Sequence, residues 1–214
     1  MKCIPRYEKL STAERNQRAL DRYLSGKLNQ TTIGRMYERY IGYLYEEKGW
    51  TVEYHGILKG YEDLGRDLIC TKGDAIRIVQ AKCWSQSKTI HEKHIFQLFG
   101  TSQLFLIAQQ FAELFPTHVG AQLVTSTCLS DVAKQAAERL KVNVKEGLVL
   151  DKQYPMIKCN INQKTKEKIY HMPFDQQYDR TKITFANGDF YTTTVAEAEK
   201  NGFRRAFRYN GGNT

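Results

Sequence analysis

Residues 64–84 read LGRDLICTKGDAIRIVQAKCW, two apolar runs joined by a Lys-Gly-Asp turn. Short runs of this kind, rich in β-branched residues and bounded by Gly and Asp, predict two antiparallel strands. Side chains alternate between the faces of a strand, so Gln80 and Lys82 share one face while Ala81 points to the core. Asp67 lies on the neighbouring strand. The stretch therefore predicts a carboxylate, an amide oxygen and an ammonium on one surface.

This polar surface interrupts an otherwise apolar strand. A charged lysine in such a strand costs stability unless it serves a function. The plain alternative is that Gln80 and Lys82 occupy solvent-facing positions of an edge strand. Glu38, on the helix predicted before the strands, adds a second carboxylate. Because these polar groups coincide, we favour a functional site over an exposed edge.

The elements around residues 64–84 predict an α/β fold with a mixed central sheet flanked by helices. A strand, a helix and a further strand in succession after residue 120 predict a parallel crossover. Ser130 is the expected N-cap of that crossover helix. In chain order, we expect a helix over 11–25, a helix from Thr31 or Thr32 to Lys48, strands within 50–57, 63–73 and 75–84, a helix over 91–115 with a break at Gly100, a strand over 121–127, a helix over 130–141 and a strand over 142–144.

The pattern changes after residue 150. Residues 157–162 and 168–173 predict two strands of a hairpin, and residues 190–203 predict a strand followed by a helix. We interpret this as a small β-β-α module, too small to form an independent core easily. The expected domains are a helical N-terminal extension (1–30), a catalytic core (31–150) and a small accessory module (151–214).

Composition limits the class of protein. The chain has 214 residues, 41% apolar and 26% charged, which is typical of a globular protein. An excess of nine positive charges favours polyanionic partners, nucleic acid foremost. No apolar run approaches the length of a membrane span, and no secretory signal begins the sequence, so we expect a cytoplasmic protein without membrane contact. The five cysteines form no CxxC pair and indicate neither a disulfide framework nor a structural zinc site.

Taken together, these motifs resemble the PD-(D/E)xK nuclease superfamily, and within it the Mrr-like restriction endonuclease domain. The resemblance covers roughly residues 30–147, and the order and spacing of the motifs match. A single D…QxK pattern occurs by chance, whereas several motifs in order are more specific. The matching segments are GRMYERY (34–40), LGRDLI (64–69), VQAKCW (79–84), LVTST (123–127) and the helix 130–140.

The resemblance implies a role for each polar residue. Asp67 is the metal-binding aspartate, Gln80 stands where the family usually has Glu or Asp, Lys82 is the motif lysine and Glu38 the helix carboxylate. Mg²⁺, with Mn²⁺ as a substitute, would then bind Asp67, Gln80 and the Ala81 backbone carbonyl, and Glu38 through water. Lys82 would orient the attacking water or stabilise developing charge. The implied reaction is hydrolysis of phosphodiester bonds in double-stranded DNA, and a homodimer would bring two active sites to the two strands.

The C-terminal segment resembles a small domain appended to bacterial nucleases, distantly similar to the Ada-type zinc-binding fold. The zinc-ligating cysteines of that fold correspond to His171, Asp175, Ala206 and Tyr209, so no zinc is expected here. The resemblance suggests that the module positions DNA, against the alternative of a solvated basic face. The candidate DNA-binding residues are Arg180, Lys182, Arg204, Arg205 and Arg208.

Several further residues are less suited to a site. His91 and His94 at helical spacing fit an exposed helix start better than a site, so we place both outside the active site. Trp84 is interpreted as a core residue or as part of the substrate rim. The same fold hosts Holliday-junction resolvases and repair nucleases, and a DNA-binding protein that no longer cleaves is a further alternative.

Overall fold

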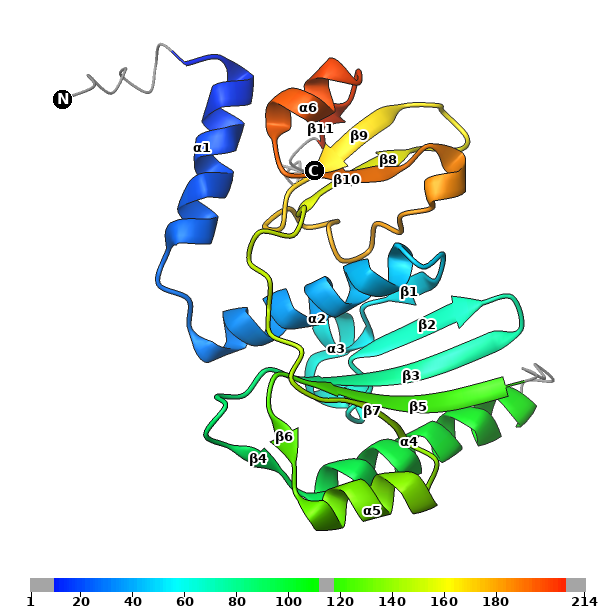
Figure 1. Ribbon diagram of the computed structural model, residues 1–214. Helices are drawn as coiled ribbons and strands as arrows, with labels where there is room; N and C mark the ends of the chain where they lie inside the picture. The colour runs from blue at the N-terminus through cyan, green and yellow to red at the C-terminus, as the bar shows by residue number, and fades with distance from the viewer. Residues whose placement is uncertain (1–9, 112–117, 207–214) are drawn as a thin grey trace, which may run out of the picture. The chain divides into compact units, whose positions relative to one another are not determined.

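The computed structural model describes residues 10–111 and 118–206, and the described chain forms two compact units (Figure 1). Unit 1 combines residues 10–27 with 152–206, and unit 2 contains residues 28–151 apart from the undescribed segment 112–117. Within the described residues, no helix has both the length and the apolar character that crossing a bilayer requires.

Unit 2 is built on a five-stranded mixed sheet in the order β1-β2-β3-β5-β7. β1, β2 and β3 are antiparallel neighbours, whereas β3, β5 and β7 run parallel. This confirms the predicted mixed sheet and the parallel crossover. The strands are β1 (Thr51–Glu53), β2 (Leu68–Lys72), β3 (Ala75–Lys82), β5 (His118–Thr125) and β7 (Asn143–Lys145).

Helices cover both faces of this sheet (Figure 1). α2 (Gln30–Glu46) lies on one face, and α4 (Glu92–Phe111) and α5 (Asp131–Arg139) lie on the other. The alternation along β3 produces both cores: Val79 packs with residues of α2, and Ile78 packs with residues of α4 and α5. β3 is thus an interior strand with two buried faces, not the edge strand of the plain alternative.

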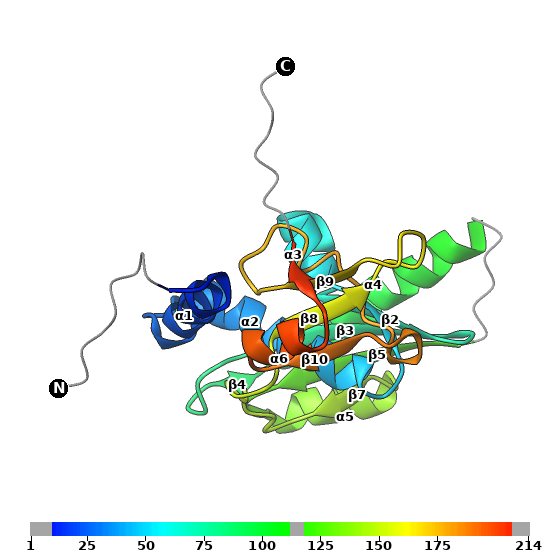
Figure 2. The ribbon, with the colours of Figure 1, turned by 90° about the horizontal axis from the view of Figure 1, so that it is seen from above.

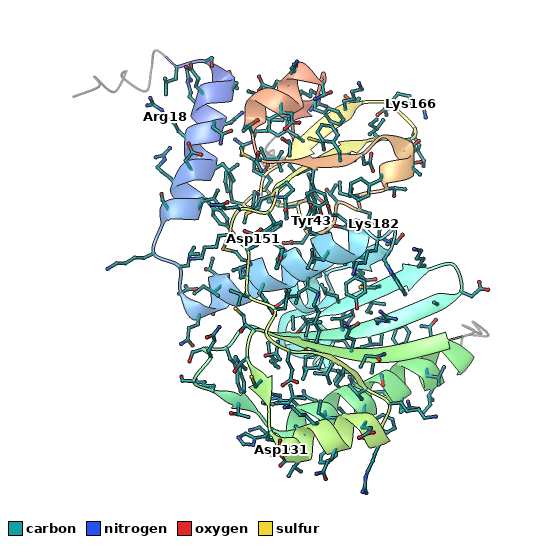
Figure 3. The ribbon with its side chains drawn as sticks, in the orientation of Figure 1. Arg18, Tyr43, Asp131, Asp151, Lys166 and Lys182 are labelled. Atoms are coloured by element: carbon teal, nitrogen blue, oxygen red, sulfur yellow. The ribbon has the colours of Figure 1, made fainter. Side chains whose placement is uncertain are left out.

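The helix starts follow local capping chemistry. Ser130 caps α5 as predicted, because its Oγ accepts the Ala133 N–H at 3.2 Å. Asp131, the first residue of α5, is labelled in Figure 3. α2 begins earlier than Thr31 or Thr32: Asn29 is its cap and accepts the Thr32 N–H at 2.8 Å.

Two predicted details of unit 2 are wrong. The first strand ends at Glu53. The chain then forms α3 (His55–Lys59) and the 3₁₀ turn η2 (Gly60–Asp63). The Gly56 N–H donates to the Asp67 carbonyl, so this segment packs against the start of β2 instead of extending β1. α4 runs through Gly100 without a break, since one helical glycine costs only about 1 kcal/mol relative to alanine. A small parallel pair, β4 (Thr89–Ile90) with β6 (Cys128–Leu129), was not predicted.

Unit 1 holds a four-stranded sheet in the order β10-β8-β9-β11. The predicted hairpin is β8 with β9, and the predicted strand and helix are β10 and α6, which lies beside β8 and β10 (Figure 2). β11 adds a parallel edge strand to β9, so the unit is larger than the expected β-β-α module. The elements are β8 (Ile157–Ile161), β9 (Lys168–His171), η3 (Phe185–Asn187), β10 (Phe190–Thr192), α6 (Val195–Lys200) and β11 (Arg204–Arg205).

The N-terminal helix α1 (Thr12–Ser25) belongs to unit 1 instead of forming a separate extension. A capping box formed by Ser11 and Glu14 begins the helix. Leu20 is buried with the apolar residues of β8, β9 and α6. The Asn16 amide donates to the Tyr170 hydroxyl at 2.8 Å, and Gln17 accepts the Val195 N–H at 2.8 Å. The sequence predicts two separate domains, 1–30 and 151–214. In the structure, the described parts of both, residues 10–27 and 152–206, belong to one unit.

Candidate active site

The antiparallel pairing of β2 and β3 brings the motif residues together. Leu68 pairs with Val79, so Asp67, just before β2, lies beside the carboxyl end of β3. The Asp67 N–H donates to the Val79 carbonyl at 3.0 Å. Asp67 Oδ2 in turn accepts the Ala81 N–H at 2.6 Å. Backbone pairing alone therefore fixes the Asp67 carboxylate between the positions of Gln80 and Lys82.

Glu38 reaches the same place from α2. A Cβ built on Gly56 would lie 3.2 Å from Asp67 Oδ1 and 3.3 Å from Glu38 Oε2. Both carboxylate oxygens thus border one small space, and the missing side chain of Gly56 keeps that space open. The predicted convergence of the helix carboxylate with Asp67 is present in the structure.

The Asp67 carboxylate is held in an unfavourable environment. Burial raises its pKa to about 6, and the nearby Asp63 carboxylate acts in the same direction. The Ala81 N–H and the Lys82 ammonium oppose this rise without cancelling it. A carboxylate that is costly to ionise in the unliganded protein gains from a cation placed beside it.

Gln80 is fixed by one end of its amide. Its side chain is 1% exposed, and Nε2 donates to the Gly65 carbonyl at 3.1 Å. Gln80 Oε1 is buried, and no residue in the described part of the chain donates a hydrogen bond to it. A buried amide oxygen without a donor is suited to accept from water or to ligate a hard cation.

Gln97 of α4 is a neighbour of this site that the sequence analysis missed. A Cβ on Gly65 would lie 2.8 Å from Gln97 Nε2 and 2.9 Å from Gln80 Nε2. Gly65 also has φ +76°, so its turn favours glycine for two independent reasons. Position 97 is one turn after His94 on the predicted helix 91–115, but helical periodicity does not show which turn meets the end of β3.

Lys82 lies at the edge of an open groove. The groove has a volume of about 700 Å³ and is lined by the N-terminal end of α2, by residues 81–85 and by Lys88. The Lys82 carbonyl accepts the Ser126 N–H at 3.1 Å, which fixes the backbone. Within the described residues, no acidic group forms an ion pair with the Lys82 ammonium. Its charge therefore remains available to a ligand in the groove.

His94 is closer to the site than the sequence analysis expected. Its ring contacts Trp84 edge-on at 5.2 Å between centroids. Burial lowers the His94 pKa, and the Lys82 ammonium lowers it further, which favours the neutral imidazole. The ring packs against Trp84 and is not among the residues that line the groove.

A divalent metal fits the donor set at Asp67. Within the described residues, no three His, Cys, Asp or Glu side chains cluster as a metal site. Mg²⁺ commonly takes only one or two protein carboxylates and fills its shell with other oxygens. Asp67 Oδ1 and Glu38 Oε2 supply two such carboxylate oxygens, and the donor-free Gln80 Oε1 is a further oxygen at the end of β3.

The candidate DNA-binding residues of unit 1 differ in exposure and in whether they form an ion pair. Arg180 and Lys182 are exposed, and neither forms an ion pair within the described chain. Lys182 is labelled in Figure 3. Arg204 pairs with Glu167 at 2.9 Å, and both side chains are more than a third exposed. Arg205 is half-buried and pairs with Asp175 at 2.7 Å. Arg208 lies outside the described residues.

The predicted counterparts of zinc ligands also lie in unit 1. His171 is 7% exposed, and burial lowers its pKa to about 4. Asp175 accepts the Met172 N–H at 2.8 Å in addition to its ion pair with Arg205. Ala206 donates its N–H to the Tyr170 carbonyl, and Tyr209 lies outside the described residues.

Comparison with known proteins finds a family match over unit 2. The model of the restriction endonuclease family Mrr_cat matches residues 30–150. The comparison with curated proteins found no match. A crystal structure described as a protein of unknown function, AF1548, is 13% identical with a TM-score of 0.37, over 52% of this chain and 58% of that one. MspJI restriction endonuclease in complex with a 27-mer oligonucleotide is 12% identical with a TM-score of 0.39, over 65% of this chain and 32% of that one.

Proposed function

Because the chain belongs to the Mrr_cat restriction endonuclease family, we propose that it is a metal-dependent endonuclease that hydrolyses phosphodiester bonds in double-stranded DNA. The observation that carries this proposal is the convergence of Asp67 Oδ1 and Glu38 Oε2 around Gly56, beside Gln80 and Lys82. Two carboxylate oxygens facing one small space are poorly accounted for by packing alone, since like charges repel.

In this proposal, Asp67 and the Gln80 side-chain oxygen hold Mg²⁺ or Mn²⁺, with the Ala81 carbonyl as a further ligand and Glu38 acting through water. The metal, when bound, polarises the phosphate and lowers the pKa of a water molecule. Asp67 is positioned for this role by the Ala81 N–H, which holds Oδ2 and leaves Oδ1 directed toward Glu38.

Lys82 supplies the positive charge that the chemistry needs. It lies at the end of β3 with its backbone held by Ser126, and no ion pair with a described acidic residue fixes its ammonium. We assign it to orienting the attacking water and stabilising charge that develops on the phosphate. The Gly65 carbonyl holds the Gln80 amide in its observed orientation.

Double-stranded DNA is the proposed substrate on grounds of charge. The chain carries a net charge of +9, and the groove beside Lys82 contains a second cation, Lys88. In unit 1, Arg180 and Lys182 are the proposed phosphate contacts, with Arg204 able to exchange its exposed ion pair for a phosphate. Action on branched DNA, as in a junction resolvase or repair nuclease, requires the same chemistry with a different substrate shape.

Cleavage of supercoiled plasmid tests the proposal. The full chain should convert it to nicked and linear DNA with Mg²⁺ or Mn²⁺ and not with EDTA. Asp67→Ala should be inactive, whereas Asp74→Ala, which removes an exposed carboxylate from the turn between β2 and β3, should cleave like the parent. Linear product without accumulated nicks would support two active sites acting together, as in a homodimer. If plasmid, linear duplex and branched DNA all remain uncut, and Asp67→Ala binds DNA as well as the parent, the result would favour a DNA-binding protein that does not cleave.

A further inference from the structure

The groove beside Lys82 has features that phosphodiester hydrolysis alone does not require. Its volume of about 700 Å³ is in the range of pockets that hold a single nucleotide-sized ligand. The charged side chains of its described lining are Lys82 and Lys88, and no acidic side chain contributes. Trp84 adds a large aromatic surface between these two cations in the sequence. The lining therefore combines attraction for phosphate with a surface for a base.

Contacts to its backbone and to its ring hold Trp84 in place. The Ser126 hydroxyl donates to the Trp84 carbonyl at 2.7 Å, and the His94 ring packs edge-on against the indole. The Lys88 ammonium lies 5.9 Å from the centroid of the same ring. A half-buried indole that lines the groove is suited to stack a base, while Lys88 attracts the phosphate of the same nucleotide.

We propose that this groove holds one nucleotide of the cleaved DNA strand outside the base stack, with its base against Trp84. The inference rests on the proposed function, since it takes Lys82 to mark the scissile phosphate. A base-paired duplex keeps its bases stacked and cannot insert one into a pocket of this size without extruding it. Extrusion costs least where the base is already unpaired, so the preferred substrate is DNA with a bulge, flap or junction near the cleaved bond.

Tryptophan fluorescence tests the proposal directly. The chain contains two tryptophans, so Trp50→Phe leaves Trp84 as the sole reporter. This variant is titrated in EDTA with three duplexes of one sequence: fully paired, with a single unpaired nucleotide, and with an abasic unit at that position. The unpaired base should quench Trp84 and bind about 5- to 150-fold more tightly than the abasic duplex, the range typical of one base stacked on an aromatic ring.

Substitutions separate stacking from charge. Trp84→Leu keeps an apolar side chain against the core and should remove the preference for the unpaired base, whereas Trp84→Phe should retain most of it. Lys88→Gln should weaken all three duplexes by a similar factor, because a phosphate contact does not depend on the base. Melting temperatures of the variants report whether each remains folded.

The results distinguish this inference from the nuclease proposal. Equal affinity for the unpaired and abasic duplexes, or a uniform loss of affinity in a folded Trp84→Leu protein, overturns the stacking role. Cleavage is assayed separately with Mg²⁺. Cleavage without a base preference rejects the groove proposal and retains the nuclease. A base preference without cleavage of any substrate rejects the nuclease and the placement of the nucleotide at a scissile phosphate, and retains only the stacking of an unpaired base on Trp84.

Discussion

Two carboxylates, Asp67 in unit 2 and Asp175 in unit 1, occupy similar semi-enclosed positions but are satisfied differently. Asp175 accepts from Arg205 through Oδ1 and from the Met172 N–H through Oδ2. Asp67 accepts the Ala81 N–H through Oδ2, while its Oδ1 faces Glu38 and has no hydrogen-bond donor among the described residues. Asp175 uses both oxygens within the protein, and Asp67 keeps one for a ligand. The comparison separates a carboxylate that stabilises its unit from one placed for chemistry.

The largest expected effect is on catalysis at Asp67. Asp67→Asn keeps an acceptor for the Ala81 N–H but removes the charge, so metal-dependent cleavage should fall by at least about a thousandfold. Without metal, the same variant should be as stable as the parent or more stable. The pKa of Asp67 is higher in the folded protein than in the unfolded chain, so ionising this carboxyl destabilises the folded state. The free energy of unfolding therefore falls as pH rises from about 4 through about 6.

Asp175→Asn is the matched change in unit 1, and it should lower stability. Cleavage assays and denaturant unfolding in EDTA give the two readouts for both variants. A stability loss at Asp67→Asn as large as that at Asp175→Asn would remove the distinction between the two carboxylates.

The second expected effect concerns the two neighbouring arginines of β11. Arg205→Ala leaves the Asp175 carboxylate half-buried without its cation and also removes a hydrogen bond to Asn16, so unit 1 should lose about 3 kcal/mol. Arg204→Ala breaks an exposed pair and should cost less than about 1 kcal/mol.

Hydrogen exchange at β8 and β9 measures these changes within unit 1. Both tryptophans, Trp50 and Trp84, lie in unit 2, so fluorescence follows the other unit as an internal control. Equal losses at Arg204 and Arg205 would show that burial does not distinguish the two ion pairs.

The same comparison shows what sequence reasoning could reach. The alternation along β3 predicts that Gln80 and Lys82 share a face, and Ser130 predicts the start of α5, because both depend on neighbouring residues. The resemblance further implies that Asp67 and the helix carboxylate Glu38 belong to one site. Asp67 lies beside the end of β3 because β2 and β3 are antiparallel neighbours, and the Lys-Gly-Asp turn between them already predicts that pairing.

Contacts between distant segments were beyond the sequence. Gly56 fits a strand by its neighbours, but its N–H donates to the Asp67 carbonyl and turns the chain into α3. Asn16 of α1 donates to Tyr170 of β9, a pairing that no local pattern specifies. Gln97 meets Gln80 only because of the rotation of α4 on the sheet. In each case tertiary packing decided among arrangements that local preferences left equivalent.

A third expected effect is a pH dependence confined to unit 1. Burial lowers the pKa of His171 to about 4, with the Lys158 ammonium acting in the same direction and Asp175 opposing it. The unfolded chain takes up the proton near pH 6.5 and the folded unit does not, so stability should fall as pH drops from about 6.5 to 4 and level off below that. The loss should be on the order of 3 kcal/mol.

His171→Gln should flatten this dependence, and His91→Gln, an exposed substitution in unit 2, should leave it unchanged. Hydrogen exchange of β8 and β9 at several pH values gives the readout. An unchanged pH profile in His171→Gln would assign the acid sensitivity to another group.

The smallest expected effect tests the exposed cations of unit 1. Arg180→Ala and Lys182→Ala should each reduce the slope of log affinity against log salt by about 1, with a few-fold loss of DNA affinity and no change in stability. Because both side chains are exposed and form no ion pair within the described chain, their charge costs the unit nothing to retain and is available to phosphate. Lys166, an exposed lysine in the turn between β8 and β9, provides a control for position (Figure 3). If Lys166→Ala lowers the slope as much as Lys182→Ala, unit 1 contributes only a diffuse positive field, and Arg180 and Lys182 do not mark a defined DNA contact.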